Sequence, residues 1–263
     1  MLSDPGTLGN LEDAAESLFD PEFWRARGEL AAVSGGRGSA WFIASRERQW
    51  VLRHLRRGGF IARLSQDRYV WAGEERVRAF AEWRLLEQLW QWGLAVPKPV
   101  AARYSRDGIF YRCDLITRRI VDAEPLSTAL VLGPLPELSW REMGAAVARL
   151  HRAGVDHADL NAHNILLGPH GVVSVIDFDR GRLRAPGAAW RTRNLRRLRR
   201  SLVKISRALP AERFSDESWG WFLAGYADAA GGDGAAGVGA AGNGAAGRDS
   251  VAGRDGAAGR DGE

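Results

Sequence analysis

Short apolar runs between glycine-rich or charged turns dominate the first part of the chain and predict paired strands. Residues 40–44 and 50–53 form two such runs across a charged turn, directly after the glycine-rich segment 34–39. Two further strand patterns occupy residues 99–104 and 109–116. Runs of this length between turn residues are typical of antiparallel hairpins. The pattern therefore predicts a small antiparallel sheet.

Helical spacing marks three longer segments. Residues 74–92 place large apolar side chains three and four positions apart, which predicts a helix with one broad apolar face, ending at Gly93. The same spacing predicts helices over 138–153 and 193–209. Asp20, followed by a proline, predicts the start of a short helix near the N-terminus. The apolar side chains of the first helix are Phe80, Trp83, Leu85, Leu86, Leu89 and Trp90.

Composition places the chain among soluble globular proteins. It has 263 residues, of which 45% are hydrophobic and 26% charged, and this excludes a collagen-like or wholly disordered chain. The single cysteine, Cys113, excludes an internal disulfide and a cysteine-rich zinc site, so we expect no disulfide partner. No apolar run approaches the ~18 residues of a membrane helix. The first basic residue is Arg25, whereas a signal peptide begins with basic residues, so we expect a cytoplasmic protein.

The positive charge of the chain is carried almost entirely by arginine. The formal net charge is +5, and Lys98 and Lys204 are the only lysines, so a site that depends on lysine has just these two candidates. Between Arg180 and Arg207 the sequence has eleven basic residues and no acidic one. On the predicted helix within this segment, the basic residues recur at three- and four-residue intervals and share a broad face.

Acidic and amide side chains on both sides of a predicted hairpin carry the candidate chemistry. Asp159 and Asn164 lie just before the strand pair 165–167 and 172–176, and Asp177 follows that pair. Because a hairpin returns to its starting edge, the two flanking loops lie side by side. Phosphoryl transfer needs a carboxylate to accept the hydroxyl proton, and an amide oxygen and a second carboxylate to hold Mg²⁺ on the nucleotide phosphates. The alternative is a polar turn before a hairpin, since Asp and Asn are common turn residues.

The same residues resemble the catalytic motifs of protein kinases. The segment 157–164, His-Ala-Asp-Leu-Asn-Ala-His-Asn, is similar to H-R-D-L-x-x-x-N, and Asp177 begins a segment similar to D-F-G. The resemblance implies that Asp159 is the catalytic base and that Asn164 and Asp177 hold Mg²⁺. It also places Glu82 at the kinase helix glutamate, among the residues that bind ATP. The alternative for Glu82 is a solvated helix position.

Two features depart from the kinase pattern. The glycine loop keeps Gly36 and Gly38 of G-x-G-x-x-G but has Trp41 at the third glycine. Arg53 stands where kinases have the strand lysine of V-A-I-K, with Arg63 as a less favoured alternative. Arginine is a permanent cation that can hold phosphate oxygens and pair with a carboxylate. We therefore expect Gly36, Gly38 and Arg53 to contact ATP.

Over a longer stretch the chain resembles the 3-deoxy-D-manno-octulosonic acid (Kdo) kinases of Gram-negative bacteria. Residues 51–59 carry the block Val-Leu-Arg-His-x-Arg-Arg-Gly-Gly, whose arginine explains the missing lysine. The resemblance implies ATP-dependent phosphorylation of the 4-hydroxyl of Kdo on a Kdo–lipid A precursor, in lipopolysaccharide core biosynthesis. It spans roughly residues 19–207, and its other blocks are residues 36–42, 111–117, 157–167 and 176–180.

This resemblance implies an α+β, protein-kinase-like bilobal fold. Its N-lobe is a small antiparallel sheet with one helix, and its C-lobe is mainly helical. The last residues are rich in glycine and alanine and have little to bury, which predicts a disordered tail. The predicted division is an N-terminal extension with a short helix at 1–33, the N-lobe at 34–117, the C-lobe at 118–229 and the tail at 230–263.

Two other functions remain open from the sequence. Another small-molecule or sugar kinase, of the heptose or aminoglycoside type, would share the same acidic and amide residues. A non-catalytic nucleic-acid-binding module is suggested by the isoelectric point of about 9.9. That module would leave the candidate catalytic residues without a role, so we expect no nucleic acid. After Asp179 the sequence has no A-P-E segment and no long activation loop, which favours a non-protein acceptor.

The basic helix indicates where such an enzyme works. The implied acceptor is a phosphorylated, carboxylated glycolipid of the inner membrane, and each basic residue near an anionic surface contributes about 1 kcal/mol. We expect Arg196, Arg197 and Arg200 to face this anionic membrane surface. The protein is then peripheral on the cytoplasmic face of the inner membrane. The alternative is a solvated basic face.

Overall fold

The computed structural model describes residues 1–8, 15–32, 40–45, 48–56 and 67–231. Residues up to Gly231 belong to one compact unit, and residues 232–263 lie outside the described residues. The predicted glycine loop with Gly36 and Gly38, and the alternative cation Arg63, also lie outside them. The predicted four-part division of the chain stays a prediction.

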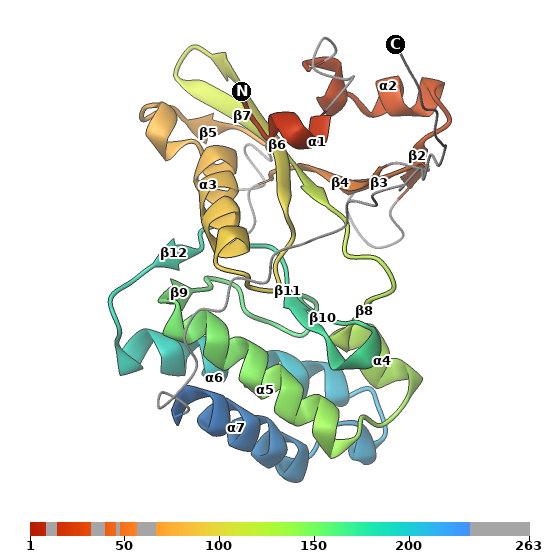
Figure 1. The fold of residues 1–263 in the computed structure, drawn as a ribbon, viewed down its shortest axis with the longest axis vertical. Helices are drawn as coiled ribbons and strands as arrows, with labels where there is room; N and C mark the ends of the chain where they lie inside the picture. The colour runs from red at the N-terminus through yellow and green to blue at the C-terminus, as the bar shows by residue number, and fades with distance from the viewer. Residues whose placement is uncertain (9–14, 33–39, 46–47, 57–66, 232–263) are drawn as a thin grey trace, which may run out of the picture. The chain divides into compact units, whose positions relative to one another are not determined.

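An antiparallel sheet dominates the first half of the described unit (Figure 1). Its strand order is β1-β6-β7-β4-β3-β2, and β5 also pairs with β7. Both predicted hairpins are confirmed. The second runs longer than predicted because polar residues at its tip still pair, as Arg106 does with Tyr111. The strands are β1 (Leu2–Ser3), β2 (Leu30–Ala32), β3 (Ala40–Ala44), β4 (Gln49–His54), β5 (Tyr69–Val70), β6 (Pro99–Asp107) and β7 (Phe110–Arg118).

Two short helices, α1 (Pro5–Leu8) and α2 (Pro21–Ala26), lie near the N-terminus. The predicted start of α2 is confirmed, because the Asp20 side chain accepts a hydrogen bond from the backbone N–H of Glu22 at 2.9 Å. This bond satisfies one of the amide groups that a helix leaves free at its first turn.

Helix α3 (Arg78–Gln91) packs on the sheet and follows a 3-10 turn at Glu74–Arg76, so the predicted helix over 74–92 is shorter than expected. Gly93 ends it in a left-handed conformation, with φ of 71°. The predicted apolar face is wrong at Trp90, which is 44% exposed. The reason is that the buried face centres on Glu82 and Leu89, and Trp90 lies at its flank. Glu82 is therefore not on a solvated face.

The second half of the described unit is mainly helical. The predicted helices over 138–153 and 193–209 correspond to α5 and α6. Helix α6 begins earlier than predicted because its first turn buries Trp190, and it ends earlier, at Ser206. Helices α4 and α7 were not predicted from the sequence. The four are α4 (Leu126–Leu132), α5 (Glu137–Arg152), α6 (Ala188–Ser206) and α7 (Asp216–Gly231).

Helices α5 and α7 approach closely because glycines lie at their contact. A Cβ atom on Gly144 of α5 would lie 2.0 Å from the carbonyl oxygen of Phe222. A Cβ atom on Gly225 of α7 would lie 2.1 Å from the carbonyl oxygen of Arg141. Neither position has room for a side chain, so the two glycines set the distance between the helices.

Short strands between the two halves flank the loops on which Asp159, Asn164 and Asp177 lie. The predicted hairpin is confirmed as an antiparallel pair, β10 with β11, in which Ile165 lies opposite Val175. β8 adds to the other edge of β10. The strands are β8 (Glu124–Pro125), β9 (Val155–Asp156), β10 (Ile165–Leu167), β11 (Val173–Val175) and β12 (Arg182–Leu183), the last paired with β9.

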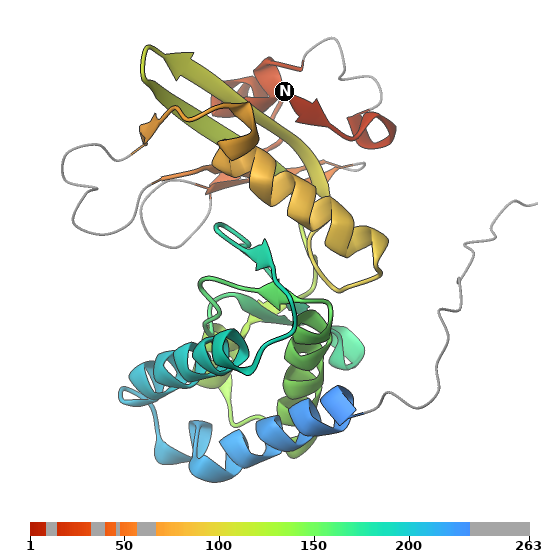
Figure 2. The ribbon, with the colours of Figure 1, turned by 90° about the vertical axis from the view of Figure 1, so that its left-hand side faces the viewer.

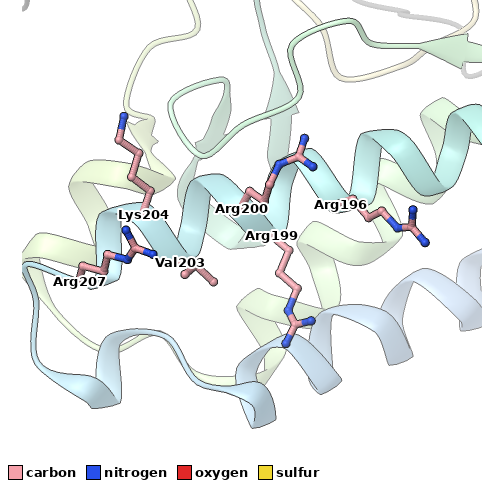
Figure 3. Close-up of a pocket in the computed structure, with 6 residues that line it drawn as sticks. All are labelled: Arg196, Arg199, Arg200, Val203, Lys204 and Arg207. Carbon is pink, nitrogen blue, oxygen red and sulfur yellow. The ribbon is translucent and has the colours of Figure 1, made fainter.

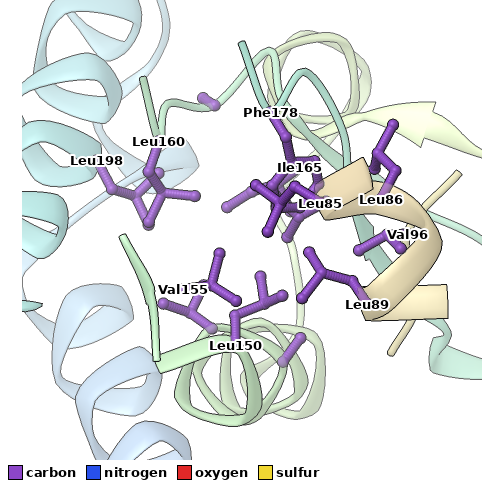
Figure 4. Packing of buried hydrophobic residues seen from close by; sticks show 14 of the residues in the cluster. Leu85, Leu86, Leu89, Val96, Leu150, Val155, Leu160, Ile165, Phe178 and Leu198 are labelled. Carbon is purple, nitrogen blue, oxygen red and sulfur yellow. The ribbon is translucent and has the colours of Figure 1, made fainter. Parts of the chain in front are cut away.

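In the view of Figure 2 the sheet half lies above the helical half. One hydrophobic core continues from the first half into the second (Figure 4). In Figure 4 the α3 side chains of Leu85 and Leu86 lie beside Ile165 and Phe178. The rest of the cluster reaches Leu198 on α6. Strand β10 and the segment that follows β11 are therefore packed directly against α3. The described residues thus form the predicted α+β fold, with a small antiparallel sheet, one long helix on it and a mainly helical second half.

No helix among the described residues combines the length and the apolar character needed to cross a membrane.

Candidate active site

His157 fastens the loop that carries Asp159 to the end of β11. The backbone N–H of Asp159 donates a hydrogen bond to Nδ1 of His157 at 3.2 Å, and Nε2 of His157 donates to the carbonyl oxygen of Ile176 at 3.0 Å. These partners require the neutral tautomer with its hydrogen on Nε2. Burial lowers the pKa of the His157 imidazole, which favours this neutral form. The Asp159 loop is thereby held in one position.

Asn164 forms hydrogen bonds within the same loop and to the residue that follows β11. Its Nδ2 donates to the backbone carbonyl oxygen of Asp159 at 3.0 Å, and its backbone carbonyl oxygen accepts from the backbone N–H of Ile176 at 2.9 Å. The amide nitrogen is therefore occupied, and the amide oxygen is the atom that can hold a cation. Ile176 immediately precedes Asp177, so the hairpin brings the two predicted metal-binding residues to the same edge, as the sequence pattern indicates.

Asp177 has a strained backbone. Its φ is 64°, the left-handed region that residues other than glycine rarely adopt. Its carboxylate is 38% exposed, and its Oδ1 accepts a hydrogen bond from Nη1 of Arg53 at 2.7 Å. Strain of this kind persists where the surrounding structure enforces it, and it is concentrated at functional sites. An amide oxygen and a carboxylate are oxygen donors that suit Mg²⁺, which keeps several waters and takes phosphate oxygens besides.

Arg53 joins the sheet to α3 and to the Asp177 segment. Its Nη2 forms an ion pair with Oε1 of Glu82, while its Nη1 binds Asp177. Burial opposes the charge on Arg53, but the two carboxylates outweigh it and raise the pKa of the guanidinium. Burial raises the pKa of the Glu82 carboxyl to about 7, although the attraction of Arg53 opposes the shift. One arginine thus contacts both carboxylates that the kinase resemblance assigns to this region.

Each residue of the segment 177–179 is held by a side chain of the sheet half. Asp177 binds Arg53, and the backbone N–H of Phe178 donates to Oε1 of Glu82 at 3.1 Å. Asp179 accepts from Nε of Arg78, at the start of α3, at 2.9 Å, and pairs with the Nη2 of the same arginine. The position of this segment is therefore coupled to the position of α3.

Helix α6 supports the Asp159 loop from the other side. The buried Asn194 accepts a hydrogen bond from the backbone N–H of His157 at 3.0 Å and donates to Asp156 at 2.9 Å. Two turns further along α6, Oγ of Ser201 accepts from the backbone N–H of Ala162 at 3.2 Å. Both ends of the loop are thus anchored on one face of α6.

Arg197 lies between these two anchors and contacts the predicted base. Its Nη1 donates to Oδ1 of Asp159 at 2.9 Å. The sequence grouped Arg197 with Arg196 and Arg200 as membrane-facing residues, and the structure separates it from them by this ion pair. Its spacing from Asn194 and Ser201, three and four positions, was the available signal that it lies toward the loop.

The predicted site residues in the described part of the chain therefore lie in two linked groups. Asp159 and Asn164 share one loop, and Arg53, Glu82 and Asp177 form a continuous chain of contacts. The hairpin β10–β11 connects the groups. A carboxylate on one loop, further oxygen donors on two loops and a cation on the adjoining sheet are the groups that a phosphotransferase with a kinase-like fold needs.

Comparison with known proteins agrees with this class. Residues 21–226 match the model of the lipopolysaccharide kinase (Kdo/WaaP) family, and the chain belongs to that family. It is therefore a phosphotransferase with a hydroxyl acceptor, and the predicted kinase-like fold is confirmed.

Several curated proteins are similar in sequence to this chain. The chain is 48% identical over 196 residues to the 3-deoxy-D-manno-octulosonic acid kinase of Stenotrophomonas maltophilia strain K279a, covering 74% of this chain and 78% of the relative. It has the same identity and coverage with the protein of that name from Xanthomonas euvesicatoria pv. vesicatoria strain 85-10. It is 48% identical over 188 residues to that of Xylella fastidiosa strain M12, covering 72% of this chain and 75% of the relative. The predicted resemblance to Kdo kinases is confirmed.

Proposed function

We propose that the protein phosphorylates the 4-hydroxyl of Kdo on a Kdo–lipid A precursor, using ATP and Mg²⁺, in lipopolysaccharide core biosynthesis. The observation that carries the proposal is the contact of Arg53 with both Glu82 and Asp177. Without a strand lysine, a kinase needs another cation at this place, and Arg53 meets that need. The names of the relatives support Kdo as the acceptor, ahead of heptose or an aminoglycoside.

Each residue has its own proposed role in the phosphoryl transfer. Asp159 accepts the proton of the acceptor hydroxyl, whose oxygen bonds to the γ-phosphorus of ATP. The bond from that phosphorus to the bridging oxygen breaks, and ADP leaves. Arg53 holds phosphate oxygens, and Glu82 holds Arg53. Asn164 and Asp177 would hold Mg²⁺, which neutralises charge on the phosphates. The glycines Gly36 and Gly38 stay predicted ATP contacts.

The outer face of α6 supports the proposed location of the protein at a membrane surface. A pocket of about 490 Å³ lies along it, and Figure 3 shows its basic side chains. Arg199 is paired with Asp216 on α7, at 2.7 Å. The other basic side chains have no acidic partner among the described residues. We propose that this face holds the protein to the cytoplasmic face of the inner membrane. The pocket is lined by Arg196, Arg199, Arg200, Val203, Lys204 and Arg207.

One assay tests the proposed function. The protein is incubated with radiolabelled ATP and either a Kdo-bearing lipid A precursor or the same precursor without Kdo. We expect label only on the Kdo-bearing lipid, and no transfer after EDTA removes Mg²⁺. Label on the precursor without Kdo would contradict the proposed acceptor, and full activity in EDTA would contradict the proposed metal. Salt-sensitive binding to random DNA, with no transfer to any acceptor, would instead favour the nucleic-acid alternative.

A further inference from the structure

The contact between Arg197 and Asp159 points to a second feature of the acceptor site. We propose that Arg197 binds the carboxylate of the acceptor sugar and so selects an acidic sugar over a neutral one. The inference rests on the proposed function, because it concerns how the same site recognises Kdo. Arg197 then binds the substrate, whereas the sequence pattern predicted that it contacts the membrane surface.

The position of Arg197 is fixed by its helix. Asn194 and Ser201, on either side of it, bind the backbone at the two ends of the loop 157–164. Leu198, the next residue, is fully buried. The base of the Arg197 side chain therefore cannot move independently of the loop that carries Asp159.

The Arg197 guanidinium can form further hydrogen bonds. An arginine has five N–H donors in a planar fork, and the contact with Oδ1 of Asp159 uses one of them. The side chain is 44% exposed, and Asp159 is 54% exposed, so an incoming sugar can reach both. Arg197 has no second acidic partner among the residues that the structure describes.

The charge balance at Asp159 requires such a cation. Kdo carries a carboxylate on the same ring as the hydroxyl that is phosphorylated, so bringing that hydroxyl to Asp159 also brings a second negative charge close. Two neighbouring carboxylates repel unless a cation lies between or beside them. Arg193, one turn earlier on α6, is already paired with Asp156, at 2.8 Å. Arg197 is the described basic side chain that contacts Asp159.

Arginine suits this task better than lysine. Its fork can bind one carboxylate through one edge while another N–H holds a second acceptor. The guanidinium would then fix the sugar by its carboxylate and Asp159 by its Oδ1, which orients the hydroxyl toward the base. A neutral sugar offers only hydroxyl oxygens to the open edge of the fork, and these bind a cation more weakly than a carboxylate does. This difference is the proposed source of specificity.

The test compares two forms of one acceptor with two forms of the enzyme. The acceptors are the Kdo–lipid A precursor in detergent micelles and the same precursor with its Kdo carboxyl converted to the methyl ester. We expect wild-type kcat/KM to be roughly 10- to 100-fold higher for the acid than for the ester, the range for hydrogen bonds to charged groups. Arg197→Gln is expected to lose a similar factor on the acid and a smaller one on the ester, because the contact with Asp159 is lost with both. Arg197→Lys, which keeps the charge without the fork, is expected to fall in between.

The control is Arg149→Gln, at an exposed arginine of α5 outside the site, which should leave both values unchanged. Unfolding temperature and KM for ATP should stay at wild-type values in Arg197→Gln. An equal loss on acid and ester would overturn the inference, because Arg197 would then act on Asp159 alone. A raised KM for ATP would also overturn it, since it would place Arg197 on a nucleotide phosphate. If wild type phosphorylates neither acceptor, the proposed function itself has failed.

Discussion

Glu82 and Phe178 are 96 positions apart, and Oε1 of Glu82 accepts a hydrogen bond from the backbone N–H of Phe178 at 3.1 Å. The same oxygen pairs with Arg53. A carboxylate on α3 therefore holds the proposed phosphate-binding cation and the segment with the proposed metal-binding carboxylate at once. Displacement of α3 would disturb both.

The protonation of Glu82 gives a pH prediction. Its pKa is raised to about 7, chiefly by burial, so lowering the pH through about 7 adds a proton to the carboxylate. The neutral carboxyl holds Arg53 less firmly, and we expect kcat/KM for ATP to fall on the acid side. The pH profile of Glu82→Gln, measured in parallel, is expected to be lower throughout and to lack this decline. Profiles of the same shape would contradict the role of Glu82, because ATP itself titrates equally in both assays.

Arg53 is the proposed phosphate-binding cation. Arg53→Ala should lower kcat/KM for ATP by roughly 10²- to 10³-fold, the size seen when one donor to a developing charge is removed. Arg53→Lys should lose less, since one ammonium can still pair with Glu82 or Asp177. Arg63→Ala is the comparison, and we expect a smaller loss there. A larger loss in Arg63→Ala than in Arg53→Ala would show that the strand lysine is replaced by Arg63.

Asp159→Asn tests the proposed base. The change keeps the size of the side chain and its place on the loop, so folding and ATP binding should persist. Turnover should fall by roughly 10²-fold or more, as is typical when a general base is lost. The matched control is Asp107→Asn, at an exposed carboxylate on β6, and its turnover should equal that of wild type. Near-normal turnover in Asp159→Asn would remove Asp159 from the mechanism.

The sequence predicted six of the twelve described strands, all of them in three hairpins whose signal was local. The proximity of the loop with Asn164 to Asp177 was predictable for the same reason. Asp159 and Asn164 lie on one loop, and Asp177 follows a hairpin that their spacing already indicates. Arg197 could not be placed in this way, because its partner lies 38 positions away and only the packing of α6 joins them. In a run of arginines, the sequence does not distinguish a residue that faces solvent from one that contacts a carboxylate.

Two helices of the helical half, α4 and α7, were missed by sequence reasoning for local reasons. Helix α4 is only seven residues long and begins directly after Pro125, which reads as a turn. Helix α7 contains Gly220, Gly225 and Gly231, and its glycine and alanine content resembles that of the tail after it. The glycine at 225 is needed for close contact with α5, which is a tertiary requirement.

That contact gives a stability prediction. Gly144→Ala places a methyl group where the carbonyl oxygen of Phe222 lies, so the helices must separate, and we expect a loss of about 1–3 kcal/mol in the free energy of unfolding. Gly220→Ala on α7 is the control, since its Cβ meets nothing within 4 Å, and better helix propensity should stabilise by up to about 1 kcal/mol. Denaturant unfolding monitored by tryptophan fluorescence measures both. Equal changes in the two variants would contradict the close packing of α5 and α7.

The last prediction concerns the outer face of α6. Arg196 and Arg200 line its pocket and have no acidic partner among the described residues, whereas Arg197 is engaged with Asp159. Reversing Arg196 and Arg200 to Glu removes attraction to an anionic surface, at about 1 kcal/mol per basic residue, and adds repulsion. We expect weaker sedimentation with anionic vesicles and a higher KM for acceptor in those vesicles. KM for ATP should stay the same.

A matched pair of variants separates membrane contact from total charge. Arg76→Glu with Arg149→Glu changes the net charge by the same amount at two exposed arginines away from α6. Because surface potential decays within about a Debye length, charges elsewhere on the molecule should matter less than those on the docking face. The control pair should therefore sediment nearly as wild type does. Raising the salt concentration should release wild type from the vesicles and reduce the difference between the two pairs. Equal weakening by both pairs would mean that net charge alone governs binding, and unchanged binding in the α6 pair would leave that face merely solvated.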